Sequence, residues 1–223
     1  MLVQVPALLD RSQLEVVSQL LSGARFQDGG LSAGHAARGV KNNQELSLSD
    51  ERLQALNRIV MGRLIAHPTY LNAALPHRVA APFYARYVPG MFYGEHVDDP
   101  VMGSGDRYRS DISITVFLSD RDAYEGGELV IETAFGERKV KLPAGDAILY
   151  PSSSLHRVTE VTRGERLVAV TWVQSLVRDP ARRALLYELS LARDALLQKD
   201  PEAGETQRVH AAHANLVRMW AEL

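Results

Sequence analysis

The feature that most constrains the fold is a series of seven short runs, rich in Val, Ile, Thr and aromatic residues, between residues 80 and 175. Gly, Pro and Asp separate neighbouring runs, and Gly136-Glu137 predicts a hairpin turn between two of them. Such a succession is typical of a β-sandwich or barrel, because alternating βαβ units would place a helical pattern between strands. The runs cover residues 80–88, 112–118, 127–132, 137–142, 146–150, 156–161 and 166–175.

A helix is predicted near the start of the chain, before these runs. Asp10 can cap its N-terminus, and Gln13 three residues later completes a capping box. Gly23 is a suitable C-terminal stop. Residues 27–36 are rich in glycine and predict a loop. The stripe that would face a core consists of Leu14, Val17, Leu20 and Leu21.

Two further helical regions flank the predicted strands. One is expected to begin after Ser49 as N-cap, since acidic residues at 50 and 51 favour the positive end of a helix. The other follows Asp179-Pro180 and covers residues 181–199 and 205–222, with Pro201 as the break. The order of helices, strands and helices predicts an α+β chain around one β core. The stripe of the middle helix consists of Leu53, Leu56, Ile59, Val60 and Leu64.

Composition excludes several classes of protein. The 223 residues suit one core, and the formal net charge of −2 offers no basic footprint for nucleic acid. The absence of cysteine excludes disulfides, zinc–thiolate sites, iron–sulfur clusters and cysteine nucleophiles. No apolar run approaches the length of a membrane span, and Asp10 comes too early for a signal peptide. We therefore expect a cytoplasmic protein without a nucleic-acid or membrane partner.

An imidazole and a carboxylate stand two residues apart at His96 and Asp98. On extended chain, residues i and i+2 face the same side, so both could bind one metal ion, whereas Asp99 would face away. His156 is a candidate third ligand. Two histidines and one carboxylate form the facial triad of non-haem Fe(II) oxygenases. Taken alone, the pair His96 and Asp98 is equally typical of a solvated loop. His156 taken alone is equally typical of a hydrogen-bonded histidine at the surface or in the core.

Arg166 strengthens the metal interpretation. We expect two antiparallel strands joined near residues 163–165 to bring Arg166 and His156 into one cavity. Arginine keeps its charge when buried and presents a rigid fork to a carboxylate. Such a group next to a metal triad suits a chelating 2-oxo acid. The alternative, a surface charge, is disfavoured by the apolar residues 167–170.

Several short motifs in a fixed order complete the pattern. They are Phe83–Tyr87, His96 with Asp98, Gly126–Leu129, Gly145-Asp146, Pro151–His156, Gly164–Arg166 and Thr171-Trp172. Together they resemble the prolyl-4-hydroxylase-type Fe(II)/2-oxoglutarate oxygenases. Over nearly its whole length the chain resembles the bacterial PKHD-type hydroxylases of the PiuC/YbiX group, which are linked with iron uptake.

This resemblance implies a fold and an activity. The fold is a double-stranded β-helix, or jelly roll, over residues 78–176, with helical support from 1–77 and a helical tail from 177–223. The activity is hydroxylation of a C–H bond with release of succinate and CO2, with ascorbate as a candidate reductant. The implied residues are His96, Asp98 and His156 for Fe(II), Arg166 and Tyr87 for 2-oxoglutarate, and Tyr84, Thr171 and Trp172 for the pocket lining.

Other interpretations stay open from the sequence alone. A cupin-like metalloenzyme would use no 2-oxo acid, and a non-catalytic module would sense iron or 2-oxoglutarate. The substrate is either a peptide side chain or a small molecule such as a siderophore. We expect the loops 99–110 and 120–126 to rim the site, with a polar rim hinted at by Asp106, Arg107 and Arg109. The tail helices offer a surface for homo-oligomerisation.

A few polar residues have no clear place in the site. Glu128 and Asp146 are expected either to support the metal ligands or to shape turns. His210 and His213 lie three residues apart on the tail and predict an exposed polar face, since no third ligand has matching spacing. The remaining histidines, His35, His67 and His77, have no partner pattern.

Overall fold

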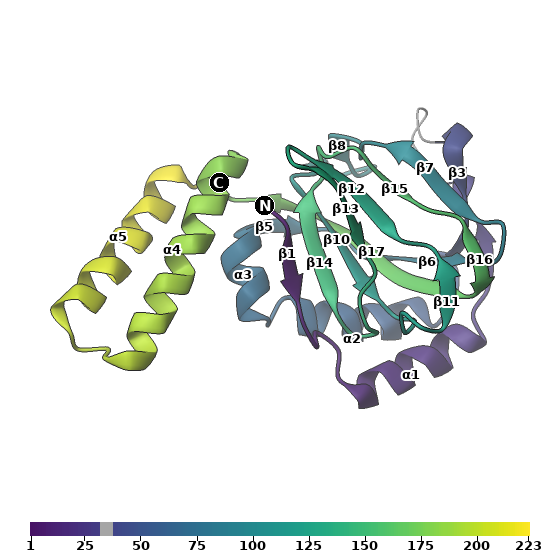
Figure 1. The fold of residues 1–223 in the computed structure, drawn as a ribbon, viewed down its shortest axis with the longest axis horizontal. Coiled ribbons are helices and arrows are strands. Elements are labelled where there is room, and N and C mark those ends of the chain that lie inside the picture. The colour runs from purple at the N-terminus through teal and green to yellow at the C-terminus, as the bar shows by residue number, and fades with distance from the viewer. Residues whose placement is uncertain (32–37) are drawn as a thin grey trace.

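Two antiparallel sheets face each other in the computed structural model, which describes residues 1–31 and 38–223 (Figure 1). In spatial order the larger sheet contains β1 (Val3–Val5), β14 (Ala147–Pro151), β10 (Ile112–Phe117), β17 (Arg166–Ser175), β6 (Phe83–Tyr87), β4 (Gln44–Leu46) and β2 (Phe26–Asp28), with β5 (Pro76–Val79) paired to β17. The smaller sheet contains β13 (Gly136–Val140), β12 (Leu129–Thr133), β15 (His156–Val158), β7 (Phe92–His96) and β3 (Lys41–Asn42). Two short ladders join β11 (Tyr124–Gly126) to β16 (Val161–Gly164) and β8 (Val101–Met102) to β9 (Tyr108–Arg109). The predicted jelly roll is confirmed.

The larger sheet is buried on both faces. Along β14, Leu149 packs in the cluster under the sheet, whereas Ile148 and Tyr150 pack in the cluster between the two sheets. Every residue of β10 is buried for the same reason. A strand that is covered on both faces has a continuous run of apolar residues, and not an alternation of apolar and polar residues. Each of the seven predicted runs contains a strand, and the predicted hairpin joins β12 to β13.

Three helices cover the outer face of the larger sheet: α1 (Arg11–Ser22), α2 (Leu53–Leu64) and α3 (Pro68–Ala74) (Figure 1). The first helix has the predicted Asp10 capping box and ends at Gly23. The predicted start of the second is wrong, because α2 begins at Leu53 without a side-chain cap. The Asp50 carboxylate instead accepts the backbone N–H groups of Arg25 and Arg52, at 2.8 and 2.9 Å, and so fixes the turns before the helix.

Residues 1–77 supply more than helical support. They add β1 to one edge of the larger sheet, β4 and β2 to the other edge, and β3 to the smaller sheet. Asp146 fastens β1, since its carboxylate accepts hydrogen bonds from Gln4 Nε2 at 2.9 Å and from Ala7 N at 2.8 Å. The glycine-rich stretch 27–36 contains the end of β2 and the 3-10 turn η1 (Gly29–Leu31), and His35 lies outside the described residues. A second 3-10 turn, η2 (Arg38–Val40), leads into β3.

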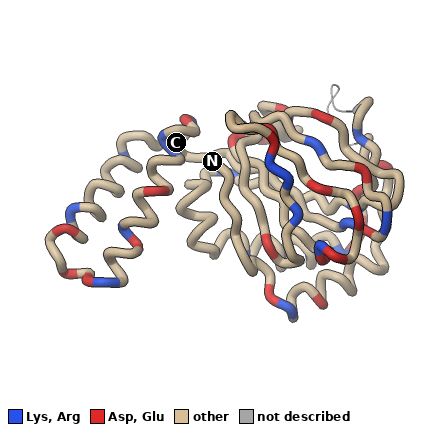
Figure 2. The backbone as a smooth tube through the Cα atoms, in the orientation of Figure 1, with Lys and Arg blue, Asp and Glu red and all other residues tan. Residues whose placement is uncertain are grey.

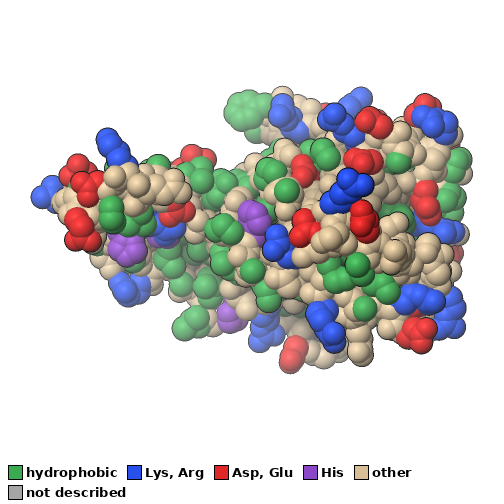
Figure 3. All heavy atoms as spheres, turned by 90° about the horizontal axis from the view of Figure 1, so that it is seen from below, with side chains coloured by type: hydrophobic (Ala, Val, Ile, Leu, Met, Phe, Trp, Pro, Cys, Tyr) green, Lys and Arg blue, Asp and Glu red, His purple; other side chains and the backbone are tan. Residues whose placement is uncertain are grey.

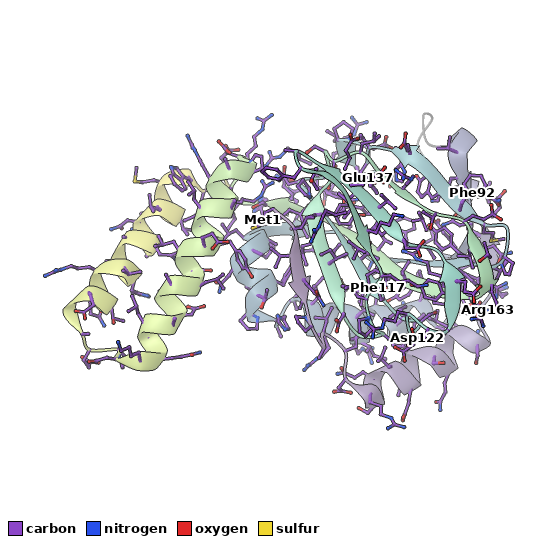
Figure 4. All side chains as sticks on the ribbon, in the orientation of Figure 1. Met1, Phe92, Phe117, Asp122, Glu137 and Arg163 are labelled. Atoms are coloured by element: carbon purple, nitrogen blue, oxygen red, sulfur yellow. The ribbon has the colours of Figure 1, made fainter. Side chains whose placement is uncertain are left out.

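The tail is a helical hairpin of α4 (Pro180–Lys199) and α5 (Gly204–Trp220) that projects from the barrel (Figure 1). Its root lies close to Met1, which Figure 4 labels, and the backbone N–H of Glu222 donates to the carbonyl of Leu176 at 2.7 Å. His210 is exposed as predicted, but His213 is buried, and its Nδ1 lies 3.0 Å from the Arg193 guanidinium inside the hairpin.

The molecular surface is mixed in character. Acidic and basic residues are interspersed along both the barrel and the tail (Figure 2). Seen from below, hydrophobic side chains gather where the tail meets the barrel (Figure 3). On the tail itself Leu185 and Met219 are exposed, and self-association through these helices stays a prediction. Among the described residues, no helix is long and apolar enough to cross a membrane.

Candidate metal centre and co-substrate pocket

A cavity of about 620 Å³ lies between the two sheets, and both sheets supply its walls. Strands β6, β10 and β17 line it from the larger sheet, and β7, β12 and β15 line it from the smaller one. The loop after β7 and the β8–β9 ladder form part of its edge. Polar groups that converge in one largely apolar cavity mark the usual place for a ligand.

Three candidate metal ligands meet in this cavity. His96 ends β7 and His156 begins β15, and the two residues are direct partners in the ladder that joins these strands. Asp98 follows two residues after His96. Its Oδ1 lies 3.8 Å from His96 Nε2 and 3.9 Å from His156 Nε2, and the three ligand atoms are all within 4.8 Å of one another. One ion can therefore contact all three.

The histidines present the correct nitrogen to a metal. His96 Nδ1 lies 2.9 Å from the Gly94 carbonyl oxygen, and His156 Nδ1 lies 2.9 Å from that of Ser154. A carbonyl only accepts, so each Nδ1 carries a proton, and in the neutral imidazole Nε2 is the nitrogen that offers a lone pair. Burial, followed by the proximity of His156, lowers the pKa of His96 to about 4. The imidazole is therefore neutral near pH 7, as metal binding requires.

Asp98 uses its two oxygens differently. Oδ1 faces the histidines, while Oδ2 accepts hydrogen bonds from Ser113 Oγ at 2.5 Å and from Trp172 Nε1 at 2.9 Å. A ligating carboxylate with one oxygen engaged in this way is held in orientation. The donor set of two imidazoles and one carboxylate suits Fe(II) with positions left open.

Arg166 is an unusual group for a protein interior. It opens β17 and is 1% exposed, and its Nε and Nη1 atoms have no hydrogen-bond partner among the described residues. Its guanidinium lies over the ring of Tyr87, 4.9 Å from the centroid, and 5.8 Å from that of Phe117. A buried cation without an anionic partner is costly. The positive charge of Arg166 in this cavity could therefore be paired with the carboxylate of a ligand.

Comparisons with known proteins agree with this site. Residues 82–174 match the model of the 2OG-Fe(II) oxygenase superfamily. A PKHD-type hydroxylase of Thioalkalivibrio sulfidiphilus is 56% identical, and one of Synechococcus elongatus is 46% identical, each over 100% of both chains. The chain belongs to the PKHD-type hydroxylases. It is an oxygenase of the Fe(II)- and 2-oxoglutarate-dependent class.

Solved structures support the fold of this hydroxylase. A prolyl-4-hydroxylase of Pseudomonas putida superposes with a TM-score of 0.55 at 19% identity, over 78% of this chain and 92% of that one. HygX of Streptomyces hygroscopicus, with nickel, 2-oxoglutarate and hygromycin B bound, has a TM-score of 0.56 at 14% identity, over 79% and 84% of the two chains. At these identities the likeness concerns the jelly roll alone.

Of the three residues predicted to line the pocket of the hydroxylase, Trp172 lines the cavity, as does Tyr87, which was predicted to bind 2-oxoglutarate. Tyr84 and Thr171 do not, because neighbouring residues on a strand face opposite sides. Tyr84 packs in the cluster beneath the larger sheet, and the Thr171 hydroxyl donates to the Ala80 carbonyl at 2.7 Å. Thr171 and Trp172 are adjacent, so only one of them could face the cavity.

The expected pairing of the strands that carry His156 and Arg166 is wrong. β15 pairs with β12 and β7 in the smaller sheet, whereas β17 belongs to the larger sheet. The connection through β16, which pairs with β11, carries the chain from one sheet to the other. His156 and Arg166 therefore line one cavity from opposite walls.

Predictions about the rim and about supporting residues had mixed outcomes. The loop 99–110 contributes to the cavity edge, but no residue of 120–126 lines it. Arg109 pairs with Asp111 at 2.7 Å, and neither Asp106 nor Arg107 is among the lining residues. Asp146 serves β1, and Glu128 accepts a hydrogen bond from Thr159 at 2.5 Å, so both shape the fold. His67 and His77 lie outside the cavity lining.

Sequence reasoning missed several cavity residues. Tyr93 stacks on His96 with ring centroids 3.6 Å apart and planes 12° apart, and Tyr150 meets His156 edge-on at 5.1 Å. Lys41 and Glu45 form a buried ion pair of 2.5 Å in the wall. Tyr93 lies three residues before His96 in the sequence. The regular alternation of a strand puts residues three apart on opposite faces, so it does not predict this contact.

Proposed function

We propose that the hydroxylase holds Fe(II) through His96, Asp98 and His156 and binds the distal carboxylate of 2-oxoglutarate through Arg166. The observation that carries this proposal is the buried guanidinium in the cavity that contains the triad, since its Nε and Nη1 have no partner in the part of the chain that the structure describes. A dicarboxylate that chelates the metal at one end needs such a partner at the other end. A cupin-like enzyme without a 2-oxo acid has no use for this charge.

Each residue has a physical task in this proposal. The two histidines offer neutral Nε2 atoms because their Nδ1 protons are donated to backbone carbonyls. Arg166 supplies two donors in a fixed plane. Burial raises the pKa of Tyr87, so its hydroxyl keeps its proton and can donate to the co-substrate beside Arg166.

The net reaction is insertion of one oxygen atom of O2 into a substrate C–H bond, while 2-oxoglutarate takes the other atom and leaves as succinate and CO2. Bound Fe(II) supplies the oxidising chemistry, and the protein supplies orientation and a dry cavity. Ascorbate is the reductant that we expect to keep the metal in the Fe(II) state.

The walls near the cavity edge favour an apolar contact with the substrate. Phe83 and Trp172 meet edge-to-face with centroids 5.7 Å apart, and the apolar residues Val97, Val101 and Met102 of the β7–β9 region line the same cavity. We propose that the C–H bond to be oxidised belongs to an aliphatic group held against these surfaces. A prolyl or lysyl side chain and the aliphatic part of a siderophore both meet this condition. The siderophore would account for the link with iron uptake.

The first test is spectroscopic. We expect the anaerobic protein with Fe(II) and 2-oxoglutarate to show a weak charge-transfer band near about 500 nm, because a facial triad leaves two adjacent positions for the chelate. Air should bleach the band and yield succinate. His96→Ala should abolish both signals, whereas His77→Ala, a change at an exposed histidine, should not. Metal binding without the band would favour the cupin-like alternative, and a band without succinate would favour a sensor.

The substrate is then found by stimulated turnover. Prolyl and lysyl peptides and siderophores are added in parallel, and succinate release is compared with the uncoupled rate. Stimulation by a siderophore alone would support the link with iron uptake. Stimulation by peptides alone would contradict that link and leave the oxygenase assignment intact.

A further inference from the structure

The carboxylate of Asp98 is held by more than its expected metal. Its Oδ2 atom receives two donors, the Ser113 hydroxyl at 2.5 Å and the Trp172 indole at 2.9 Å. Ser113 on β10 and Trp172 on β17 are direct partners in the ladder that joins these strands. Cross-strand partners project from the same face of a sheet. The larger sheet therefore directs two donors at one oxygen of a residue that follows the smaller sheet.

A third residue fixes the direction of this network. Ser152 Oγ lies 2.7 Å from Ser113 Oγ, and both serines are buried, Ser152 with 1% and Ser113 with 0% exposure. A hydroxyl has one proton, and an ionised carboxylate only accepts. Because Ser113 gives its proton to Asp98, Ser152 must donate to Ser113. The chain Ser152 to Ser113 to Asp98 has one polarity, and hydrogen bonds in such chains strengthen one another.

The indole is fixed as firmly as the serines. Trp172 meets Phe83 edge-to-face with ring planes at 73°. The backbone of β17 is held by β10 on one side and by β6 on the other. The Ser113 hydroxyl and the Trp172 indole are thus held in position by the fold and do not depend on a bound metal.

The number of metal bonds made by Asp98 decides whether the site can work. An octahedral ion has six positions, and two imidazoles with a one-oxygen carboxylate leave three open. A chelating 2-oxo acid would take two of these positions, which would leave one. A carboxylate that bound through both oxygens would remove this last position.

We propose that Ser113, Ser152 and Trp172 are positioning residues that hold Asp98 as a one-oxygen ligand and keep a coordination position free. The inference rests on the assignment of Asp98 as a metal ligand made above. These residues act through Asp98 and have no part in binding the metal themselves. Loss of either donor should loosen the carboxylate, and loss of both should allow Oδ2 to compete for the metal.

The test measures metal binding and not turnover. The chain has two tryptophans, so in a Trp220→Phe background Trp172 is the sole indole and reports a nearby metal by quenching. Co(II) is titrated into this background and into Ser113→Ala and Ser152→Ala made within it. Ser190→Ala is the matched control, since Ser190 is also fully buried but donates to the Tyr187 carbonyl in α4.

We expect Ser113→Ala to raise the Kd for Co(II) by about 10- to 100-fold, the usual loss when a partner of a metal ligand is removed. Ser152→Ala should cause a smaller loss, and Ser190→Ala none. Trp172→Phe, which keeps a ring against Phe83, is followed by Co(II) absorption instead of fluorescence. With the Ser113→Ala and Trp172→Phe changes combined, 2-oxoglutarate should bind the metal-saturated protein more weakly, as judged by the band near about 500 nm.

Two results would overturn the proposal. One is a Co(II) Kd in Ser113→Ala and Trp172→Phe that matches the Ser190→Ala value. The other is a loss of metal binding in proportion to a lower melting temperature of the metal-free protein, which would make the residues merely structural. Failure of the unsubstituted protein to bind Co(II) is distinguishable, since it would overturn the proposed function and this inference together.

Discussion

Replacement of Arg166 by methionine should have opposite effects on binding and on stability. The guanidinium is 1% exposed, and its Nε and Nη1 have no partner within residues 1–31 and 38–223. Methionine fills a similar volume against Tyr87 and Phe117 without a buried charge. The substitution therefore removes the unfavourable free energy of burying this charge. It also removes the group that we assign to 2-oxoglutarate binding.

The magnitudes follow from the two hydrogen bonds that one edge of the guanidinium can donate to a carboxylate. Two hydrogen bonds from a charged donor contribute about 1.5–3 kcal/mol each, or about 3–6 kcal/mol together. This loss corresponds to a Kd for 2-oxoglutarate that is higher by about 10²- to 10⁴-fold. Replacement of a buried ion pair by apolar residues is neutral or stabilises by about 1–4 kcal/mol; on this scale for Arg166, lost cation–π contacts offset about 1–2 kcal/mol. A net gain of about 1 kcal/mol raises the Tm of a chain of this size by about 2–4 °C.

Two measurements on one protein preparation test this reasoning. The band near about 500 nm is titrated anaerobically with 2-oxoglutarate at saturating Fe(II), and Tm is measured without metal or co-substrate. Arg163→Met, at an exposed arginine paired with Glu125, is the control and should change neither quantity much. A 2-oxoglutarate Kd within tenfold of the unsubstituted value would refute the assignment of Arg166. A Tm lowered by several degrees would show that the guanidinium supports the fold.

Three further outcomes are expected. Metal-free protein should lose stability as pH falls from about 6.5 towards 4, by up to about 1.4 kcal/mol per pH unit, because burial lowers the pKa of His96 and the unfolded chain takes up a proton that the folded chain lacks. Urea denaturation across this range measures the loss, and a flat profile would contradict it. Fe(II) or Co(II) at 100 times its Kd should stabilise the protein by about 2.7 kcal/mol, and a chelator should reverse the gain in Tm. Asp146→Ala should lower the free energy of unfolding by about 2–4 kcal/mol, since two hydrogen bonds hold β1 to the sheet. Hydrogen exchange at residues 3–5 should become faster. Faster exchange only at other residues would argue that Asp146 does not anchor β1.

The parts of the fold that could be predicted are those with local signals. The α1 capping box involves residues three apart, and the central strands β10 and β17 of the larger sheet are long enough to show an apolar run. His96 and Asp98 lie two residues apart, so their convergence needs only extended chain. His156 and Arg166 were candidates from their residue types and from the antiparallel strands expected to carry them. Tyr87, Tyr84, Thr171 and Trp172 were assigned through the resemblance, whose motifs preserve an order along the chain.

The missed features depend on contacts between distant segments. β1, β3 and β4 have two or three residues each, too few for an alternation pattern, and they exist because β14, β7 and β6 offer free edges. The strand that carries Arg166 was expected to pair with the strand that carries His156. Between them the chain passes through β16 from the smaller sheet to the larger one, and the ten-residue spacing of His156 and Arg166 does not reveal this. The Lys41–Glu45 pair arises from a segment that precedes the matched residues 82–174.

The contact between Tyr93 and His96 shows how a local irregularity completes the site. Along the ladder, His156 pairs with His96 and Val158 pairs with Tyr93, so three residues of β7 span two of β15. The extra residue is a β-bulge, which brings Tyr93 to the side of His96 and turns the Gly94 carbonyl towards His96 Nδ1. Gly94 is suited to this place, because a Cβ there would lie 2.8 Å from the Cβ of Val40.

The stack therefore predicts a difference between two substitutions at Tyr93. Tyr93→Leu removes an aromatic contact of about 0.5–1.5 kcal/mol and frees the imidazole, so the Kd for Co(II) should rise by about 2- to 12-fold. Tyr93→Phe keeps the ring and should bind Co(II) like the unsubstituted protein. Equal losses in the two variants would mean that the hydroxyl, and not the stacked ring, holds His96 in place.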